Sequence, residues 1–146
     1  MMIIAAHNGK DRKLPARLIY YYVNAQRRRS DLAFFQVELN FLQELLSDHF
    51  MQLTVDSEGR KRSKRLKTAL FQLEKKIAGC SVRLDAHLHL ITSQAEKPEE
   101  PGEALAAGQV ALDQLVTELT GRYRKTKKEL FALITEVIRE NKFLAG

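Results

Sequence analysis

Residues 66–91 read LKTALFQLEKKIAGCSVRLDAHLHLI, and this stretch decides the fold. Apolar side chains, one cysteine and one histidine recur along it in alternating steps of four and three residues. These positions are Leu66, Leu70, Leu73, Ile77, Cys80, Leu84, His87 and Ile91. The spacing places all eight side chains on one stripe of an α-helix, and such a sustained repeat is typical of coiled-coil-like packing. The sequence therefore predicts a long helix whose stripe, here called the central seam, is covered by other helices.

The composition of the 146-residue chain indicates a helical protein of the cytoplasm. Only three prolines and seven glycines occur, which argues against a loop-rich or all-β fold. No run of about 18 apolar residues is present, so we expect no membrane span. The apolar residues Met1–Ala6 are too few for the core of a signal peptide. The single cysteine, Cys80, lies on the central seam, where we expect a small buried thiol that stays reduced in the cytoplasm.

Two further helices are predicted on either side of the central one, which itself should span about residues 61–94. Turn-forming residues separate the three helices at 54–59 and 96–102, and residues 1–14 carry no periodic signal. The predicted first helix, about residues 15–53, has its stripe at Tyr21, Ala25, Leu32, Phe35, Leu39, Leu42, Leu46, His49 and Leu53, with Arg28 as one intruder. The predicted last helix, about residues 103–143, has its stripe at Leu105, Gly108, Leu112, Leu115, Leu119, Arg122, Thr126, Leu130, Leu133 and Val137.

The first helix has two possible starting points. Ser30-Asp31 could cap a fresh helix, which would then be only about 36 Å long. A helix that starts at Pro15 would be about 58 Å long, close to the other two, and would cover the whole central seam. We therefore predict an all-α fold, an elongated antiparallel up-down-up three-helix bundle that forms a single domain over residues 1–146, with a break near Ser30 as the alternative.

Helix lengths and short turns also predict which residues lie at the same height. Arg122 and Thr126 interrupt the stripe of the last helix, and Arg122 should contact Glu44 or Asn40 and fix the register of the helices. Gly79 and Gly121 fall at nearly the same height, where we expect a close approach of two helices, with a flexing point as the alternative.

No pattern in the sequence predicts catalysis, a cofactor or a metal. His87 and His89 point about 200° apart on a helix, and His49 lies about 30 Å away along the axis, so these histidines do not converge on one ion. We interpret His87 as a core histidine with a hydrogen-bond partner. Nucleophile–base pairs, converging carboxylates and Gly-rich phosphate loops are also missing from the sequence, so we expect no enzyme.

A basic run is the main departure from a sequence built only for stability. It lies at the N-terminus of the central helix, where the helix dipole disfavours positive charge. A second run in the last helix should lie beside it and extend the same face, with Lys75, Lys76 and Arg122 adding to it. The candidate anion-binding or partner-binding residues are Arg60, Lys61, Arg62, Lys64, Arg65, Lys67, Arg124, Lys125, Lys127 and Lys128.

Three interpretations of this charge stay open. The residues could form a solvated surface, they could bind nucleic acid or another polyanion through phosphates, or they could attract an acidic partner or a second copy. An acidic group at Glu96, Glu99, Glu100 and Glu103 marks the predicted opposite end.

The first helix also carries an apolar row beyond its main stripe, at Phe34, Phe41 and Leu45. An exposed row of this kind needs a partner. The leading hypothesis is a non-enzymatic binding or scaffold protein that associates with itself or with a protein partner. Polyanion binding through the basic face is the alternative, and a metal-binding bundle is the second alternative. Neither a membrane nor a small-molecule substrate is expected as a partner.

Overall fold

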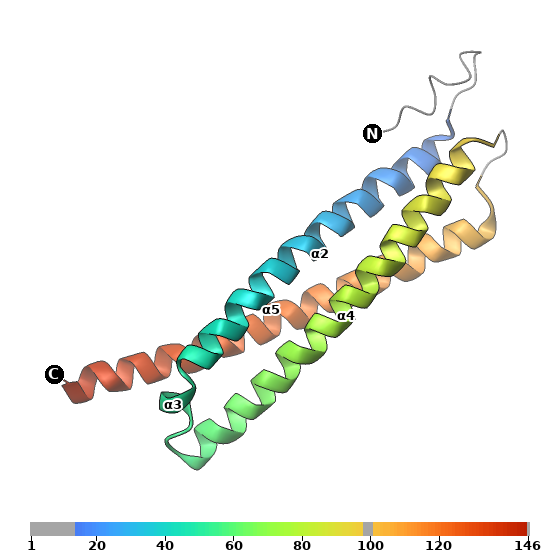
Figure 1. Ribbon diagram of the computed structural model, residues 1–146. Coiled ribbons are helices and arrows are strands. Elements are labelled where there is room, and N and C mark those ends of the chain that lie inside the picture. The colour runs from blue at the N-terminus through green and yellow to red at the C-terminus, as the bar shows by residue number, and fades with distance from the viewer. Residues whose placement is uncertain (1–13, 98–100, 146) are drawn as a thin grey trace. The chain divides into compact units, whose positions relative to one another are not determined.

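The computed structural model describes residues 14–97 and 101–145, and the elements within these ranges are helices joined by turns (Figure 1). No strand occurs in this part of the chain. The helices are α2 (Ala16–Asp48), α3 (Phe50–Leu53), α4 (Ser57–Ala95) and α5 (Glu103–Ala145). The all-helical prediction is confirmed for these residues, while the irregular start predicted for residues 1–14 falls almost wholly outside them.

The helices contribute to two compact units. Unit 1 comprises Met1–Ala33 and Gly79–Thr117, and unit 2 comprises Phe34–Ala78 and Glu118–Gly146. The prediction of a single domain over residues 1–146 stays a prediction.

Unit 1 has a core to which α2, α4 and α5 each contribute. Leu18, Leu84 and Val116 are fully buried, one from each helix. Polar contacts on the flanks join the same three segments in pairs. Arg29 of α2 forms an ion pair with Asp85 of α4 at 2.9 Å, and Asn24 of α2 donates a hydrogen bond to Asp113 of α5 at 2.8 Å.

Unit 2 combines segments of the same three helices with α3. Its core includes stacked rings of Phe35 and Tyr123, whose centroids lie 4.4 Å apart. An ion pair joins Lys127 to Glu38 at 3.0 Å, and another joins Arg62 to Glu136 at 2.9 Å. Such exposed or half-exposed pairs contribute only about 0–1 kcal/mol each, so the buried apolar side chains supply most of the stability.

The central seam is confirmed along its whole length, because all eight of its residues are buried. The stripe of the first helix is also confirmed at every position except His49, which is half-buried. The helix α2 runs unbroken through Ser30, so the alternative of a fresh helix at Ser30-Asp31 is wrong. The chain instead turns at His49, whose Nδ1 donates to the Leu45 carbonyl at 3.0 Å, and α3 follows directly.

The stripe predicted for the last helix is wrong in part. Val116 and Tyr123 are buried, whereas the predicted Leu115 is half-buried and Arg122 is exposed. Arg122 forms an ion pair with Glu118 of its own helix at 3.3 Å, so the predicted contact with Glu44 or Asn40 is also wrong. The physical reason is that two neighbouring sets of residues can form the buried stripe here, Leu115 with Arg122 or Val116 with Tyr123. The second set buries the large tyrosine ring and so removes more apolar surface from water.

The helix α4 begins at Ser57, four residues before its predicted start. Asp56 caps it, since its carboxylate accepts a hydrogen bond from the backbone N–H of Gly59 at 2.6 Å. Gly59 therefore lies in the first turn of the helix and not in the preceding loop. A Cβ atom at this position would fall onto the backbone carbonyl of Leu53, so the turn requires glycine.

The predicted close approach at Gly79 and Gly121 is wrong. Both glycines are exposed, and a Cβ atom at either position would meet nothing within 4 Å. A close contact between two helices occurs instead at Gly108 of α5, where a Cβ atom would lie 3.3 Å from the His87 ring of α4.

We expect Gly59→Ala and Gly121→Ala to change stability in opposite directions. The new Cβ atom at residue 59 overpacks against fixed backbone and should lower the free energy of unfolding by about 1–3 kcal/mol. At residue 121 it meets open space, and the better helix propensity of alanine should raise that free energy by about 1 kcal/mol. Urea titration followed by circular dichroism measures both. Stabilisation by Gly59→Ala would contradict the described turn.

Candidate functional site

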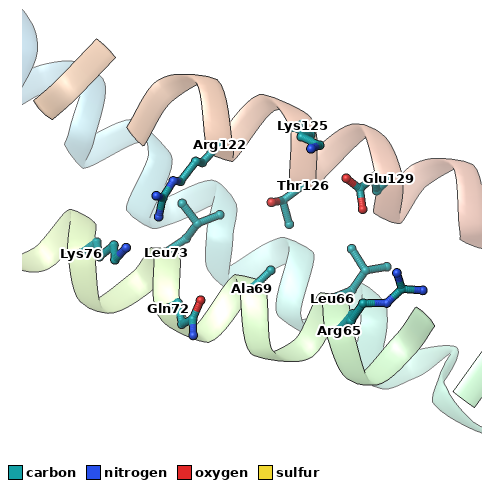
Figure 2. A pocket seen from close by; sticks show the side chains of 10 residues that line it. All are labelled: Arg65, Leu66, Ala69, Gln72, Leu73, Lys76, Arg122, Lys125, Thr126 and Glu129. Atoms are coloured by element: carbon teal, nitrogen blue, oxygen red, sulfur yellow. The ribbon is translucent and has the colours of Figure 1, made fainter. Parts of the chain in front are cut away.

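A hollow of about 330 Å³ lies between α4 and α5 within unit 2 (Figure 2). We call it the basic hollow, because four of its ten lining residues are cations. Six lining residues come from α4 and four from α5: Arg65, Leu66, Ala69, Gln72, Leu73, Lys76, Arg122, Lys125, Thr126 and Glu129.

Small side chains in the middle of the lining leave room for this hollow. Figure 2 shows Ala69 of α4 and Thr126 of α5 facing each other between the longer side chains at either end. Leu66 and Leu73 belong to the central seam and form the buried side of the hollow. A second stripe on α4 runs beside the seam with the same steps of four and three residues, and we call it the flanking stripe. It consists of Arg65, Ala69, Gln72 and Lys76, and it faces α5.

The charge around the basic hollow is strongly positive. Arg122 has Glu118 as an ion-pair partner, whereas Arg65, Lys76 and Lys125 have no carboxylate within 4.0 Å among the described residues. Glu129 is the one acid in the lining. The basic hollow is therefore suited to an anionic group that can replace the missing carboxylates.

Of the ten predicted anion-binding or partner-binding residues, the basic hollow brings together only Arg65 and Lys125. Lys127 turns to α2 and pairs with Glu38, and Arg62 pairs with Glu136. Residues two apart on a helix point about 200° apart, so neighbours in a charge run cannot all share a face. The remaining predicted cations other than Lys67 are exposed and do not line the basic hollow: Arg60, Lys61, Lys64, Arg124 and Lys128.

Sequence reasoning missed the contributions of Gln72, Thr126 and Glu129 to the basic hollow. The signal that could have found Gln72 is its place in the flanking stripe that runs beside the seam. The opening at Ala69 and Thr126 depends on two helices meeting at small residues, which no single stretch of sequence shows.

A second hollow in unit 2, of about 650 Å³, is mainly apolar. It lies between the end of α2 with α3 on one side and α4 on the other. Lys67 is its one charged lining residue, while Lys75 places its Nζ 4.8 Å from the centre of the Phe71 ring. The lining residues are Gln43, Leu46, Ser47, Phe50, Met51, Lys67, Thr68, Leu70 and Phe71. Lys67 is thus placed beside an apolar surface and not in the basic hollow.

The predicted apolar row on α2 is exposed in unit 2. The exposed fractions are 58% for Phe34 and 53% for Phe41, and Leu45 is half-buried. Val37, which the sequence reading omitted, lies between the two phenylalanines on the same side of the helix and is 71% exposed. These four residues are called the α2 row below.

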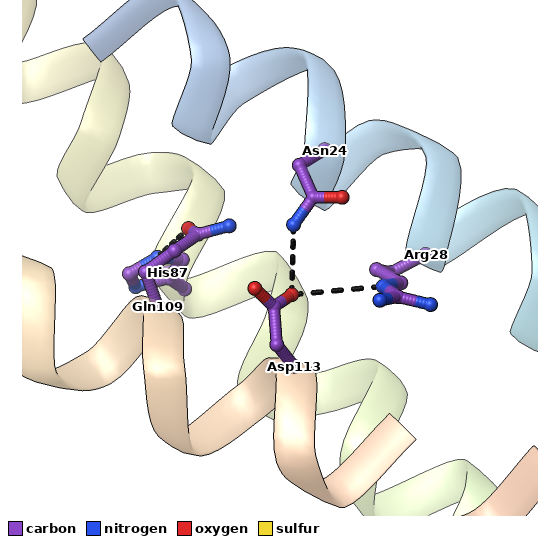
Figure 3. A network of polar contacts seen from close by, with 5 residues as sticks. All are labelled: Asn24, Arg28, His87, Gln109 and Asp113. Atoms are coloured by element: carbon purple, nitrogen blue, oxygen red, sulfur yellow. Dashed lines mark hydrogen bonds and ion pairs between the residues drawn. The ribbon is translucent and has the colours of Figure 1, made fainter. Parts of the chain in front are cut away.

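Unit 1 contains a network of polar contacts (Figure 3). His87 is buried on the central seam, and its Nε2 lies 2.8 Å from the side-chain oxygen of Gln109, to which it donates. The prediction of a core histidine with a hydrogen-bond partner is confirmed. Asp113 accepts from Asn24 and forms an ion pair with Arg28 at 3.6 Å, which explains how Arg28 can interrupt the stripe of the first helix.

Two further histidines lie within the described residues, His89 and His49. His89 is exposed, whereas His87 is buried two residues away, and His49 is engaged by its own helix. Among the described residues, no three His, Cys, Asp or Glu side chains come together as metal ligands would. The described helices also include none that is long and apolar enough to cross a membrane.

Cys80 is buried in unit 1, and burial raises the pKa of its thiol, although the charge of Arg83 partly opposes this shift. The thiolate is the reactive form of cysteine, so both the raised pKa and the lack of access make this thiol inert in the folded chain.

We expect Gln109→Leu to lower the free energy of unfolding by about 1–3 kcal/mol, because it leaves the buried Nε2–H of His87 without an acceptor. The double variant His87→Leu/Gln109→Leu removes both partners and should lose less than the sum of the two single changes. Urea titrations of the four proteins form a double-mutant cycle. Strict additivity would show that the hydrogen bond contributes nothing.

We expect Cys80 to react with an aromatic disulfide reagent at pH 8 about a hundredfold more slowly than it does in urea-unfolded protein. The raised pKa lowers the thiolate fraction at this pH, and burial blocks the reagent. Absorbance of the released thiolate measures the rate. Equal rates in the folded and unfolded protein would contradict the burial of Cys80.

The chain was compared with models of known protein families, with curated proteins and with solved structures, and none of the three comparisons finds a match.

Proposed function

We propose that this is a non-enzymatic helical-bundle protein that acts by binding protein, first of all a second copy of itself. The observation that carries the proposal is the exposure of Phe34, Val37 and Phe41 on one side of α2. Three large apolar side chains on successive turns form an exposed hydrophobic patch. Such patches are typical of interaction sites.

The proposal includes the fold expected from the sequence, in which α2, α4 and α5 run up, down and up. The contacts within unit 2 support the antiparallel course of α4 and α5. Arg62 of α4 pairs with Glu136, while Lys76, farther along α4, lines the same hollow as Arg122, which lies earlier in α5. In such a bundle the side of α2 that faces away from the seam is free for a further helix.

The spacing of the α2 row suits a second copy as the occupant. Phe34 and Phe41 are seven residues apart, and Val37 lies between them, which is the spacing of a short coiled-coil seam. Two identical rows can pack against each other about a twofold axis. Each copy then uses the same residues, and every contact occurs twice. The row therefore offers a surface that complements itself without any further element.

The free energy that the α2 row can gain by burial indicates a weak and reversible association. The three side chains are between 53% and 71% exposed, so each would gain roughly 1 kcal/mol on full burial, or about 6 kcal/mol for two copies. Association costs an estimated 4–15 kcal/mol in lost freedom, and polar contacts at the rim must supply the rest. We therefore propose a weak dimer that forms only at high micromolar to millimolar concentrations, in the cytoplasm, where Cys80 stays reduced.

We expect Val37→Glu to weaken self-association at least about tenfold, because it buries a charge in the centre of the apolar row. Val82→Glu is the matched control: Val82 is exposed to a similar extent, 68%, but lies in unit 1 outside the row. Light scattering and sedimentation over a range of concentrations measure the mass of both variants and of the unchanged protein.

Two results would overturn the proposal. One is a monomeric mass for the unchanged protein at all concentrations. The other is an equal loss of association in Val37→Glu and Val82→Glu, which would place the contact elsewhere or assign the effect to net charge.

A further inference from the structure

We propose that the basic hollow between α4 and α5 binds the phosphate backbone of a nucleic acid, without regard to its sequence. This inference goes beyond protein binding and uses a different surface of unit 2. It rests on the convergence of Arg65, Lys76, Arg122 and Lys125 on one hollow (Figure 2).

The charges of the basic hollow are available to a ligand. Three of its four cations have no carboxylate partner among the described residues, and Arg65 and Lys125 are exposed on the two opposite helices. Arg122 makes only a half-exposed pair with Glu118, which is weak enough to be exchanged for a phosphate. Arginine can contact phosphate through two parallel hydrogen bonds, and lysine adds compact positive charge.

The dimensions of the basic hollow favour an extended chain of phosphates over a single anion. Arg65 and Lys76 are eleven residues apart on α4, which corresponds to about 16 Å along the helix. One strand of DNA carries a charge about every 3.4 Å along the duplex axis, so a strand that follows this length presents several phosphates. A single phosphate could reach only some of the four cations.

The lining also indicates that bases are not read. None of the ten lining residues is aromatic, so a base finds no ring on which to stack. Ala69, Thr126 and the two seam leucines give the middle of the hollow little hydrogen-bonding capacity. Contacts to phosphate position a nucleic acid but carry no sequence information. We therefore infer binding that depends on salt and not on base sequence.

Charge-matched variants test the site. Lys76→Gln/Lys125→Gln removes two cations from the basic hollow. Lys64→Gln/Lys128→Gln removes the same charge from the same two helices, at exposed positions that do not line the basic hollow. Fluorescence anisotropy with labelled 20-base-pair DNA duplexes of two unrelated sequences, at several salt concentrations, measures affinity. Circular dichroism checks that all variants keep their helices.

The expected result is similar affinity for both sequences, with log K falling steeply and linearly against log salt. The double variant in the basic hollow should bind about tenfold more weakly than the control double variant, and its salt slope should be shallower by one to two units. Glu129→Gln removes the one acid from the lining and should strengthen binding several-fold, whereas Glu140→Gln, an exposed change outside it, should have a smaller effect.

Several results would overturn the inference. These are no binding by the unchanged protein at low salt, an equal loss in the two double variants, or unchanged binding in Glu129→Gln. Equal affinity for poly-glutamate would assign the hollow to an acidic protein instead. Because Val37 and Val82 lie outside the basic hollow, their variants separate a failure of this inference from a failure of self-association.

Discussion

Burial of the central seam is the constraint on which the rest of the structure depends. Each of its eight side chains is removed from water, which is worth about 1.5–3 kcal/mol for a fully buried leucine or isoleucine. A stripe that continues for 26 residues cannot be covered by a turn or a short helix. The helices α2 and α5, at 33 and 43 residues, are each longer than this stripe. Ion pairs and polar contacts on the flanks contribute far less.

The seam also sets where surface features can form, because the positions beside it face the grooves between helices. In unit 2 the stripe on one side of the seam, which contains Arg65 and Lys76, lines the basic hollow. The stripe on the other side, which contains Lys67 and Phe71, lines the apolar hollow. Cations that are neighbours in the sequence therefore point in different directions from the helix and have different surroundings. Of the ten predicted cations, the basic hollow therefore takes only Arg65 and Lys125.

Hydrophobic periodicity predicted the all-helical fold, the seam and the stripe of α2. It did so because apolar residues in steps of four and three lie together on one side of an α-helix. It was wrong for α5, where Leu115 and Val116 are both apolar and only the packed partners choose between them. The sequence also predicted Gly59 in a loop, because glycine usually favours turns. In the structure Gly59 lies in the first turn of α4, where its N–H donates the capping hydrogen bond to Asp56. The basic hollow could not be predicted in full, since its opening depends on small residues that meet across two helices.

The opening of the basic hollow depends on the small size of two side chains, Ala69 and Thr126, which substitutions can readily change. A longer side chain at either position would occupy the opening without altering any charge. A single substitution can thus close the hollow while all four of its cations stay in place. In diverged copies of this chain, joint retention of small residues at both positions would mark selection on the surface and not on the fold.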